Sequence, residues 1–583
     1  MKRFVQLTLI IALAVGAVSC KKDEIINTVK ETPKDTPTVK ELPPMQKITL
    51  SASSTKPGLR IAYDASRGTD VTDDNTLWQE GDEIAVYNVG VSGKPPKKFV
   101  LVDGAGTSYG TFEGNIEPTG NYYGVYPYSA VRDQVLDGSS ISIILPANQS
   151  YAEGSFGRDA AVFAATSTTE GDDVVLHFEP LLGYLSLSLK TPSNTTRDAS
   201  SIVGGHSVGS IVLHENSLGG VALSGNATID MSSADYEHDI PPTLSVAPGG
   251  SLDVTLNCGG VQLNHTTPVE FIIAVPAGAF SKGLCATVND ISGNKIMSLA
   301  TAVSNTDTIT ANCITQLPEQ DVYNMEDIVG NRYPVSKIGP NIWMGENLRV
   351  KKYDNCSEWT NKDFEIPRII TDIPDYKYYE PCYQDARDTE YWLRKSGTPE
   401  QIHLDNQYLE DPSDWSAVSA NKDKMGFSYN WAAVMGISGK DNVKDYTEPR
   451  QGICPDGWHV PSVVEYYYLL SEYVVTNLEY SGYSVYESGK FLKTVDGWSS
   501  HKSNGVVGTD DFGFSLLPAG SYSRTTIDHF ALIGSESNLW TSSYSDEEYA
   551  YQYFSTNSTN DFSYAWPAVV ASYRSVRCLK NYE

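Results

Sequence analysis

The chain has 583 residues, with 43 Lys and Arg against 72 Asp and Glu, which gives a formal net charge of −29 at pH 7. A hydrophobic content of 40% and a charged content of 20% are ordinary for a folded protein and argue against global disorder. The acidic balance argues against nucleic acid as a partner, because phosphate binding needs a surplus of Lys and Arg, and against adsorption to anionic lipid.

The first residues of the chain predict an export signal. Lys2 and Arg3 precede a mostly apolar run at residues 4–18, which is too short to span a bilayer with ~30 Å of hydrocarbon. Small residues then lead to Cys20, a pattern that resembles the lipobox of bacterial lipoproteins, in which the cysteine is lipidated and becomes the first mature residue. The resemblance implies a signal peptide over residues 1–19. Cleavage by the ordinary signal peptidase, leaving Cys20 unmodified, is the alternative.

Residues 20–45 predict a lipidated, extended tether. They contain four prolines among Thr, Lys and Glu, and no aromatic residue. The acidic pair at residues 23–24 resembles the surface-export signal of Bacteroidetes lipoproteins. It implies a protein that is anchored to outer-membrane lipid through acyl chains and is exposed at the cell surface.

Alternation of apolar and polar residues predicts β-strands throughout the first half of the chain. Leu185 and Leu187, for example, alternate with serines, and Gly, Asn, Asp and Pro interrupt such runs about every ten residues. This punctuation is typical of β-sandwiches. A polar break at residues 194–200 divides the region into one predicted sandwich at 46–193 and a second at 197–317.

Four blocks in this region resemble the fimbrillin family of Bacteroidetes. They lie at residues 78–84, 122–128, 145–149 and 178–181. In fimbrillins, a protease cut after an early arginine removes the leader, and a strand of the next subunit fills the groove that opens. The resemblance therefore implies fimbrial subunits as partners by strand exchange.

Arg60 and Arg67 lie in the region where such a cut would fall. A solvated arginine in a turn is the alternative interpretation of each. The long region that follows residue 317 favours a terminal or accessory subunit over a stalk subunit, because a stalk subunit must free its C-terminal strand.

The sequence changes character after residue 318, where Tyr and Trp become dense. Several blocks there closely resemble the Fibrobacter succinogenes major paralogous domain over about 320–580, which implies an α+β, C-type-lectin-like domain at 318–583. The predicted fold class of the chain is therefore mainly β, with two fimbrillin-type β-sandwich domains followed by this α+β domain. The blocks lie at residues 327–333, 335–339, 342–348, 429–433, 454–462, 517–520, 539–543 and 575–578.

A helix is predicted to begin after Ser462. Ser462 and Glu465 form the Ser-x-x-Glu pattern of a capping box, in which each side chain bonds to the backbone of the other residue. The apolar residues that follow recur at the spacing of one helical face. They are Tyr466, Leu469, Leu470 and Tyr473.

Cysteine usage suits an oxidising compartment. Lectin-like folds join the first helix to the last strand by a disulfide, so the resemblance implies that Cys454 pairs with Cys578. Cys356 and Cys382 are a second candidate pair. No CxxC motif occurs, which argues against zinc-ribbon and thioredoxin sites. Three further cysteines in apolar, strand-like stretches are expected to be free and buried: Cys258, Cys285 and Cys313.

No catalytic residue, metal or cofactor is predicted, because the chain carries no HExxH, GxSxG or Walker motif. His459 is a catalytic candidate by residue type alone, and a packed histidine at the start of the helix is the favoured alternative. Residues 448–450 read Glu-Pro-Arg where calcium-dependent lectins carry Glu-Pro-Asn. The sequence thus gives no support for calcium-dependent sugar binding.

Two tyrosine-rich tracts are candidate ligand contacts, because an exposed tyrosine ring can stack on a glycan; sheet packing is their alternative role. The predicted function is a cell-surface lipoprotein that acts as an adhesin or as a fimbria-associated tip or accessory protein, binding a glycan or a cell-surface protein. A surface glycan-binding lipoprotein that serves polysaccharide uptake is the alternative, and an unrecognised hydrolase is a third hypothesis. The candidate tyrosines are Tyr376, Tyr378, Tyr379, Tyr549, Tyr551 and Tyr553.

Overall fold

The structure is a computed structural model, and most of its described elements are strands. The fold is therefore mainly β, as the sequence predicts. Among the described residues, no helix is long and apolar enough to cross a membrane. The described residues are 43–54, 60–62, 77–131, 134–170, 173–193, 202–238, 240–305, 308–353, 383–385, 420–437, 449–475, 480–481, 484–485, 487–499, 507–522, 530–564 and 567–582.

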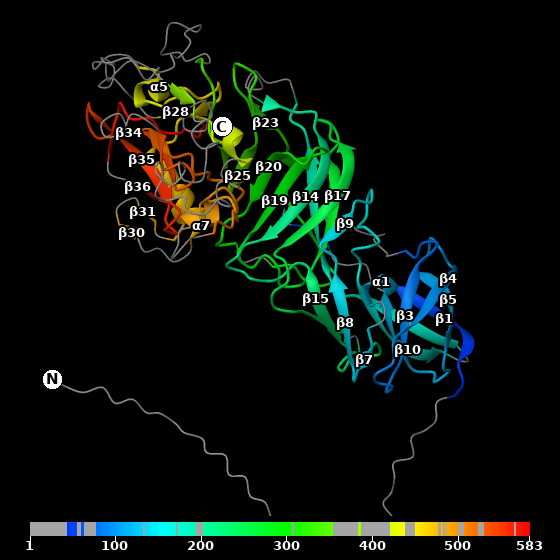
Figure 1. The fold of residues 1–583 in the computed structure, drawn as a ribbon. Helices are drawn as coiled ribbons and strands as arrows, with labels where there is room; N and C mark the ends of the chain where they lie inside the picture. Colours follow the sequence, from blue (N-terminus) through cyan, green and yellow to red (C-terminus); the bar gives the residue numbers. More distant parts are fainter. Residues whose placement is uncertain are drawn as a thin grey trace, which may run out of the picture. The chain divides into compact units, whose positions relative to one another are not determined.

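The first β unit is a closed barrel (Figure 1). Its strands follow the order β1-β11-β10-β6-β3-β4-β5, and β1 pairs in parallel with β11 and antiparallel with β5. These two pairings of β1 close the sheet, so the prediction of a sandwich here is wrong. The strands are β1 (Gln46–Ser54), β3 (Glu83–Asn88), β4 (Lys97–Asp103), β5 (Tyr109–Ile116), β6 (Tyr122–Tyr126), β10 (Phe163–Glu170) and β11 (Asp173–Pro180), and the short helix α1 (Tyr128–Val131) follows β6.

Strand β3 is buried on both faces. Ile84 and Val86 belong to the barrel core around Trp78, whereas Ala85 and Tyr87 belong to a second core outside the barrel wall. Successive side chains of a strand point to opposite faces, so both sets reach an apolar environment. The barrel wall thus also forms part of the packing with the next unit.

The second β unit recruits strands from the first predicted domain. Strand β8 pairs with β15, β9 with β17, and β12 with β18. The predicted boundary near residues 194–196 is therefore wrong, because residues 140–145, 148–150 and 183–190 pair with strands beyond it. The strands are β2 (Arg60–Ala62), β7 (Leu136–Asp137), β8 (Ser140–Leu145), β9 (Asn148–Ser150), β12 (Gly183–Lys190), β13 (Ile202–Val203), β14 (Ser207–Glu215), β15 (Gly225–Asp230), β16 (Thr243–Val246), β17 (Asp253–Gln262), β18 (Val269–Val275), β19 (Leu284–Asp290), β20 (Lys295–Ala300), β21 (Ile314–Gln316) and β22 (Gln320–Asp321).

The C-terminal region continues one sheet of the second β unit. Strand β20 pairs in parallel with β25 (Val335–Ile338), and the two lie side by side in Figure 1. The sheet then runs through β26 (Asn341–Met344) and β38 (Leu579–Lys580) to β29 (Trp458–His459). The last described strand of the chain therefore lies between two others, and main-chain hydrogen bonds cross the predicted domain boundary at residue 317.

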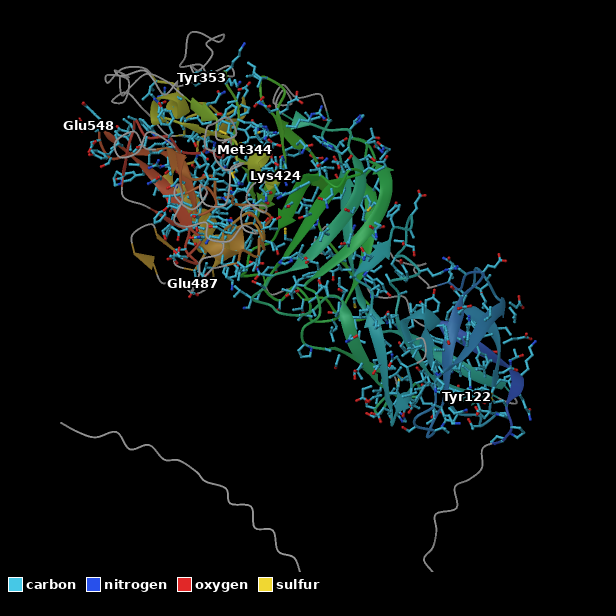
Figure 2. The ribbon with its side chains drawn as sticks, viewed as in Figure 1. Tyr122, Met344, Tyr353, Lys424, Glu487 and Glu548 are labelled. Carbon is cyan, nitrogen blue, oxygen red and sulfur yellow. A yellow bond between two sulfur atoms is a disulfide. The ribbon has the colours of Figure 1, made fainter. Side chains whose placement is uncertain are left out.

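A smaller sheet of the C-terminal region joins β34 (Glu536–Tyr544), β35 (Tyr549–Thr556), β36 (Ser563–Tyr564) and β37 (Ala568–Val569). Met344 and Tyr353 are buried in this region's packing (Figure 2). The other described elements are β23 (Asn324–Glu326), β24 (Arg332–Tyr333), β27 (Tyr383–Asp385), η2 (Lys422–Lys424), β28 (Phe427–Tyr429), α5 (Trp431–Met435), α6 (Val463–Tyr468), η4 (Leu469–Val474), β30 (Tyr480–Ser481), β31 (Ser484–Val485), α7 (Gly489–Leu492), β32 (Ser521–Tyr522) and β33 (Phe530–Ala531).

Candidate functional site

A disulfide joins the two ends of the C-terminal region's main helix-and-strand unit. Cys454 and Cys578 are bonded, with their Cα atoms 5.8 Å apart and a sequence separation of 124. This is the pair that the lectin-like resemblance implies. Each cysteine precedes one strand of the β29–β38 pair. Cys356 and Cys382 lie outside the described residues. Cys258, Cys285 and Cys313 are free, and Cys313 is only half-buried.

The predicted capping box is present at the start of α6. The Ser462 hydroxyl accepts from the Glu465 amide at 3.2 Å, and Glu465 Oε2 accepts from the Ser462 amide at 2.7 Å. Both bonds satisfy amide groups that the first helical turn leaves without partners. The predicted apolar face follows in α6 and η4. Tyr466, Leu469 and Leu470 are fully buried, and Tyr473 is half-buried.

His459 is a packed residue of this same corner. Its side chain is 2% exposed, with Nδ1 2.8 Å from Asn581 Oδ1 and Nε2 2.8 Å from Glu465 Oε1. Burial raises the pKa of the Glu465 carboxyl, but hydrogen bonds from His459 and Ser462 outweigh it, and the net shift is downward. Both ring nitrogens are thus engaged within the fold. This favours the structural alternative over a catalytic role.

The candidate tyrosines on β35 divide into two kinds. Tyr553 is fully buried, with its ring 5.0 Å from that of Tyr466 and 5.3 Å from that of Phe562. The prediction of a ligand contact at Tyr553 is therefore wrong, because sheet packing encloses it. Tyr549 is 39% exposed and Tyr551 is half-buried, so both reach the surface. Tyr376, Tyr378 and Tyr379 lie outside the described residues.

An exposed tyrosine surface that the sequence analysis missed lies around α6. Tyr468 is 52% exposed, Val464 40% and Tyr582 65%, and Tyr467 is half-buried with its ring 6.1 Å from that of Tyr468. The Tyr582 hydroxyl reaches Glu465 Oε1 at 3.5 Å, which places this residue beside the same helix. Val464 and Tyr468 are four residues apart and fall opposite the buried face, so a helical projection of the sequence would have found them. We call Val464, Tyr467, Tyr468 and Tyr582 the tyrosine surface.

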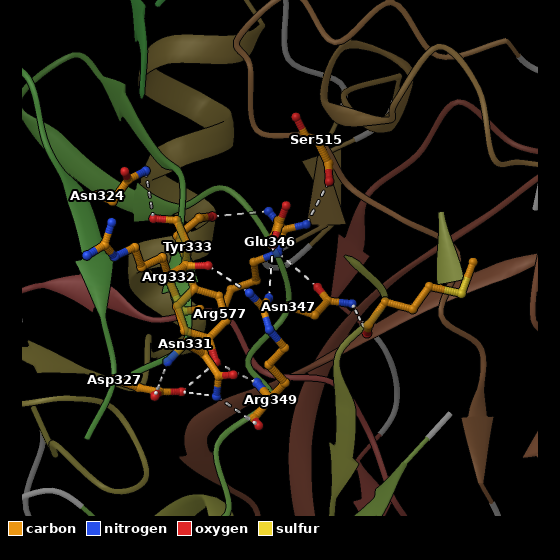
Figure 3. Close-up of polar contacts among 12 residues, drawn as sticks. Asn324, Asp327, Asn331, Arg332, Tyr333, Glu346, Asn347, Arg349, Ser515 and Arg577 are labelled. Carbon is orange, nitrogen blue, oxygen red and sulfur yellow. Dashed lines mark hydrogen bonds and ion pairs between the residues drawn. The ribbon is translucent and has the colours of Figure 1, made fainter. Parts of the chain in front are cut away.

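Arg577 joins several segments of the C-terminal region by hydrogen bonds (Figure 3). The sequence analysis did not predict this role. It is fully buried and donates to Asn347 Oδ1 at 2.9 Å, to the Met344 carbonyl oxygen at 3.1 Å and to the Ser515 carbonyl oxygen at 2.7 Å. Burial lowers the pKa of the guanidinium to about 10. Arg577 also donates a hydrogen bond to the carbonyl oxygen of Phe514. Every one of these acceptors belongs to the fold, so Arg577 is a structural cation.

Asp327 organises a second polar cluster next to Arg577 (Figure 3). Its carboxylate accepts from the Tyr333 hydroxyl at 2.7 Å and from the Asn331 amide nitrogens at 2.8 and 2.9 Å. Arg349 covers the Tyr333 ring at 4.3 Å and pairs with Glu346 at 3.0 Å. Burial, and then Asp327, raise the pKa of the Tyr333 hydroxyl well above its usual value. The conspicuous motifs at 327–333 and 342–348 therefore serve the packing.

Buried polar contacts also join the second β unit to the C-terminal region. His214 on β14 lies between Asp253, 2.7 Å from Nδ1, and Asp511, 3.0 Å from Nε2. Burial lowers the pKa of the imidazole, but its two carboxylate partners outweigh that effect and raise the pKa to about 10. Lys295 on β20 donates to Ser515 Oγ at 3.1 Å. These contacts add to the β20–β25 pairing.

The residues expected in maturation are mostly outside the described parts. Cys20 and Arg67 lie there, and of Arg60 only the backbone is described. Arg60 begins β2, whose residues pair in parallel with β21. Within the described residues, no group of three or more His, Cys, Asp or Glu side chains could hold a metal ion.

Comparison with known proteins identifies the C-terminal part. Residues 336–580 match the family model of the Fibrobacter succinogenes major domain. The C-terminal region is a Fibrobacter succinogenes major domain. The disulfide, the capping box and Arg577 all lie inside this domain, whereas the Asp327 cluster begins just before it. No protein of curated function matches the chain.

Several solved structures from Bacteroides are similar to parts of the chain. A proposed cell adhesion protein from Bacteroides uniformis is 16% identical, with a TM-score of 0.29, and the match covers 48% of this chain and 95% of that one. A proposed cell adhesion protein from Bacteroides ovatus is 10% identical, with a TM-score of 0.27, covering 45% of this chain and 89% of that one. A fimbrial protein from Bacteroides ovatus is 10% identical, with a TM-score of 0.23, and the match covers 91% of this chain and 99% of that one. Similarity at this level does not extend to function.

Proposed function

We propose that this protein is a non-enzymatic cell-surface adhesin whose Fibrobacter succinogenes major domain is the ligand-binding head. The observation that carries the proposal is the tyrosine surface around α6. Tyr468 lies on the exposed face of α6, Tyr582 lies beside that helix, and both are more than half exposed. Tyrosine offers a large, rigid, amphipathic contact area at low entropic cost, which suits both glycan and protein ligands.

The rigid support of the head is consistent with this role. The disulfide holds the segments before β29 and β38 together, and the capping box fixes the start of α6. Strand β25 extends the sheet of the second β unit beyond β20. A site on a rigid element keeps its geometry better than a site on a loop. We propose that the β units act as an arm that presents the tyrosine surface.

A tip or accessory position in a fimbria is the finer part of the proposal. Strand β38 pairs with β26 on one side and with β29 on the other, and Cys578 next to it is bonded to Cys454. A C-terminal strand held in this way is poorly suited to leave and fill a groove in another subunit. Strand exchange with fimbrial subunits would then use the first β unit, after a cut at Arg60 or Arg67.

Attachment to the outer membrane through a lipidated Cys20 completes the proposal. Exchange of Cys20 for serine should release the protein from the membrane fraction, and antibody labelling of intact cells should detect the unaltered protein. Recovery of the unaltered chain in soluble form without acyl groups would contradict the anchor.

The binding role is tested by exchanging the two most exposed tyrosines. Tyr468→Ser with Tyr582→Ser should lower the binding of the purified protein to a glycan array and to host-cell surfaces by about tenfold or more, a loss of about 1.4 kcal/mol. Tyr109→Ser is the matched control, because Tyr109 is 67% exposed on β5 of the barrel. Equal binding by the double variant and the control would refute the head as the binding domain.

The alternative role, glycan capture for polysaccharide uptake, uses the same surface. Binding of soluble polysaccharide without attachment to cells, lost in the double variant, would favour uptake over adhesion. Turnover of a bound glycan would instead revive the hydrolase hypothesis.

A further inference from the structure

A hollow of about 400 Å³ opens at one end of the barrel. It lies where β3 begins, where β6 leads into α1, and where the turn after β9 supplies Arg158 and Asp159. Gly157 allows that turn to come close, because a Cβ there would lie 2.2 Å from the Ser150 carbonyl oxygen and 2.7 Å from Asp159 Oδ1. The volume falls at the lower end of the ~300–1,000 Å³ range of small-molecule sites.

Asp82 and Arg158 form a fixed wall of this hollow. The Asp82 carboxylate is almost fully buried; it accepts from the Tyr126 hydroxyl at 3.1 Å and from the Gln79 amide at 2.7 Å, and it pairs with Arg158 Nε at 3.2 Å. Arg158 Nη2 also donates to Gln79 Oε1 at 2.9 Å and to the Glu80 carbonyl oxygen at 3.1 Å. A guanidinium held by this many acceptors is pre-organised for a ligand.

The hollow also contains polar groups that can form further hydrogen bonds. Arg158 Nη1 and the hydroxyls of Tyr128 and Ser129 have no hydrogen-bond partner within the described part of the chain. Asp159 accepts from the Ser150 amide and hydroxyl at 3.2 and 2.9 Å, and its carboxylate retains further acceptor positions. The Tyr128 ring is half-buried. Donors, acceptors and one aromatic face thus meet at a single site.

Most charges around the hollow are paired with one another. Asp82 pairs with Arg158 at 3.2 Å, and Glu83 pairs with Lys98 at 3.1 Å. Lys98 Nζ also lies 5.3 Å from the centroid of the Tyr128 ring. Both cations are thus held by carboxylates, which leaves little positive charge to attract an anionic ligand. We infer that the hollow binds a neutral mono- or disaccharide, whose hydroxyls bond to the carboxylates and to Arg158 and whose ring packs on Tyr128. The site shares no residue with the tyrosine surface, and the inference does not rest on the proposed function.

The test is a saturation-transfer NMR titration of the full chain. The probes are glucose, galactose, mannose, N-acetylglucosamine and lactose, with N-acetylneuraminic acid as the anionic comparison. At least one neutral sugar should bind in the millimolar range, and the anionic sugar should bind at least about tenfold more weakly. Ser129→Trp fills the mouth and leaves the Asp82–Arg158 pair intact, so it should weaken the neutral sugar by about tenfold or more.

Two further variants keep the inference falsifiable. Tyr128→Ala removes the aromatic face without filling the hollow and should weaken binding by a similar factor. Asn115→Trp, an equally large change at an exposed residue of β5 outside the hollow, should bind as the unaltered chain does. Absence of binding by every neutral sugar, preference for the anionic sugar, unchanged binding in Ser129→Trp and Tyr128→Ala, or equal loss in Asn115→Trp would each overturn the inference.

Discussion

The barrel and the Fibrobacter succinogenes major domain bury their interiors by different means. The barrel core is aromatic, with the Trp78 ring 5.0 to 5.6 Å from the rings of Phe112, Tyr126 and Phe178 in edge-to-face contacts, and its strands contain no cysteine. The C-terminal domain instead combines a disulfide with fully buried cations. A regular sheet satisfies its backbone through the strand ladder, whereas a loop-rich domain needs side chains to satisfy scattered carbonyl groups.

Lys493 illustrates the second strategy. It is fully buried, and its Nζ donates to the carbonyl oxygens of Thr556 and Thr559 at 2.5 and 2.6 Å. Burial lowers the pKa of its ammonium group to about 8. Arg577 does the same for the carbonyls of another loop. Such buried networks rigidify a fold when every member is satisfied.

Among the changes considered, loss of Arg577 should reduce the stability of the C-terminal domain most. Arg577→Met leaves the carbonyls of Met344 and Ser515 buried without a donor, and we expect a loss of about 4 kcal/mol. Urea unfolding followed by tryptophan fluorescence measures it, because several fully buried tryptophans lie in this domain. They are Trp343, Trp431, Trp458 and Trp540.

The control for this change is Arg332→Met. Arg332 is 62% exposed and pairs only with Glu326 among the described side chains, so its loss should cost less than about 1 kcal/mol. In calorimetry, Arg577→Met should leave a transition of the barrel unshifted. Equal destabilisation by both variants would show that buried cations are not what holds the domain.

Removal of the disulfide should have the next largest effect. Cys454→Ala with Cys578→Ala frees a loop of 124 residues, and the expected loss of stability is about 3 kcal/mol. Reduction of the unaltered protein should lower its melting temperature toward that of the double variant. Cys258→Ala, which removes a free buried thiol of the second β unit, is the control. Its melting temperature should fall on reduction as much as that of the unaltered protein.

The smallest loss of stability is expected from a change at His214, where the second β unit meets the C-terminal domain. The pKa of His214 is higher in the folded state than in the unfolded state. Its contribution to the free energy of unfolding is therefore complete below pH about 6.5 and is lost as the pH rises to about 10. His214→Gln should cost about 1–2 kcal/mol at pH 7. Its melting temperature should also fall less between pH 7 and 10 than that of the unaltered chain.

The matched control for the junction is His238→Gln. His238 pairs with Asp235 at 2.7 Å, but its side chain is 72% exposed, so its loss should change neither the stability nor its pH dependence measurably. If the second β unit and the C-terminal domain unfold in separate transitions in the unaltered chain, the junction does not couple them.

Short-range features could be predicted from the sequence. The capping box at Ser462 and the apolar face of α6 follow from residues within two helical turns, and their geometry needs no distant partner. The cysteine pair came from the family resemblance. Tyr553 was misjudged because a tyrosine in an alternating strand can face either the solvent or a second layer, and the sequence of one strand does not distinguish the two.

Strand pairing could not be predicted. Nothing local to β1 shows that it will pair with both β5 and β11 and so close the barrel, or that β8 will leave its neighbours for β15. The partners of Arg577 are likewise spread from Met344 to Ser515. Contacts of this kind depend on which segments the whole fold brings together.

Periodicity and capping act over a few residues, so the mainly β character, the place of the C-terminal domain and the start of its helix can be inferred from the amino-acid order alone. Long-range packing sets where the units divide, which tyrosines remain at the surface, and that a polar hollow forms at the end of the barrel. These properties arise from hydrogen bonds and burial between segments far apart in the chain, whose free energies no local pattern records.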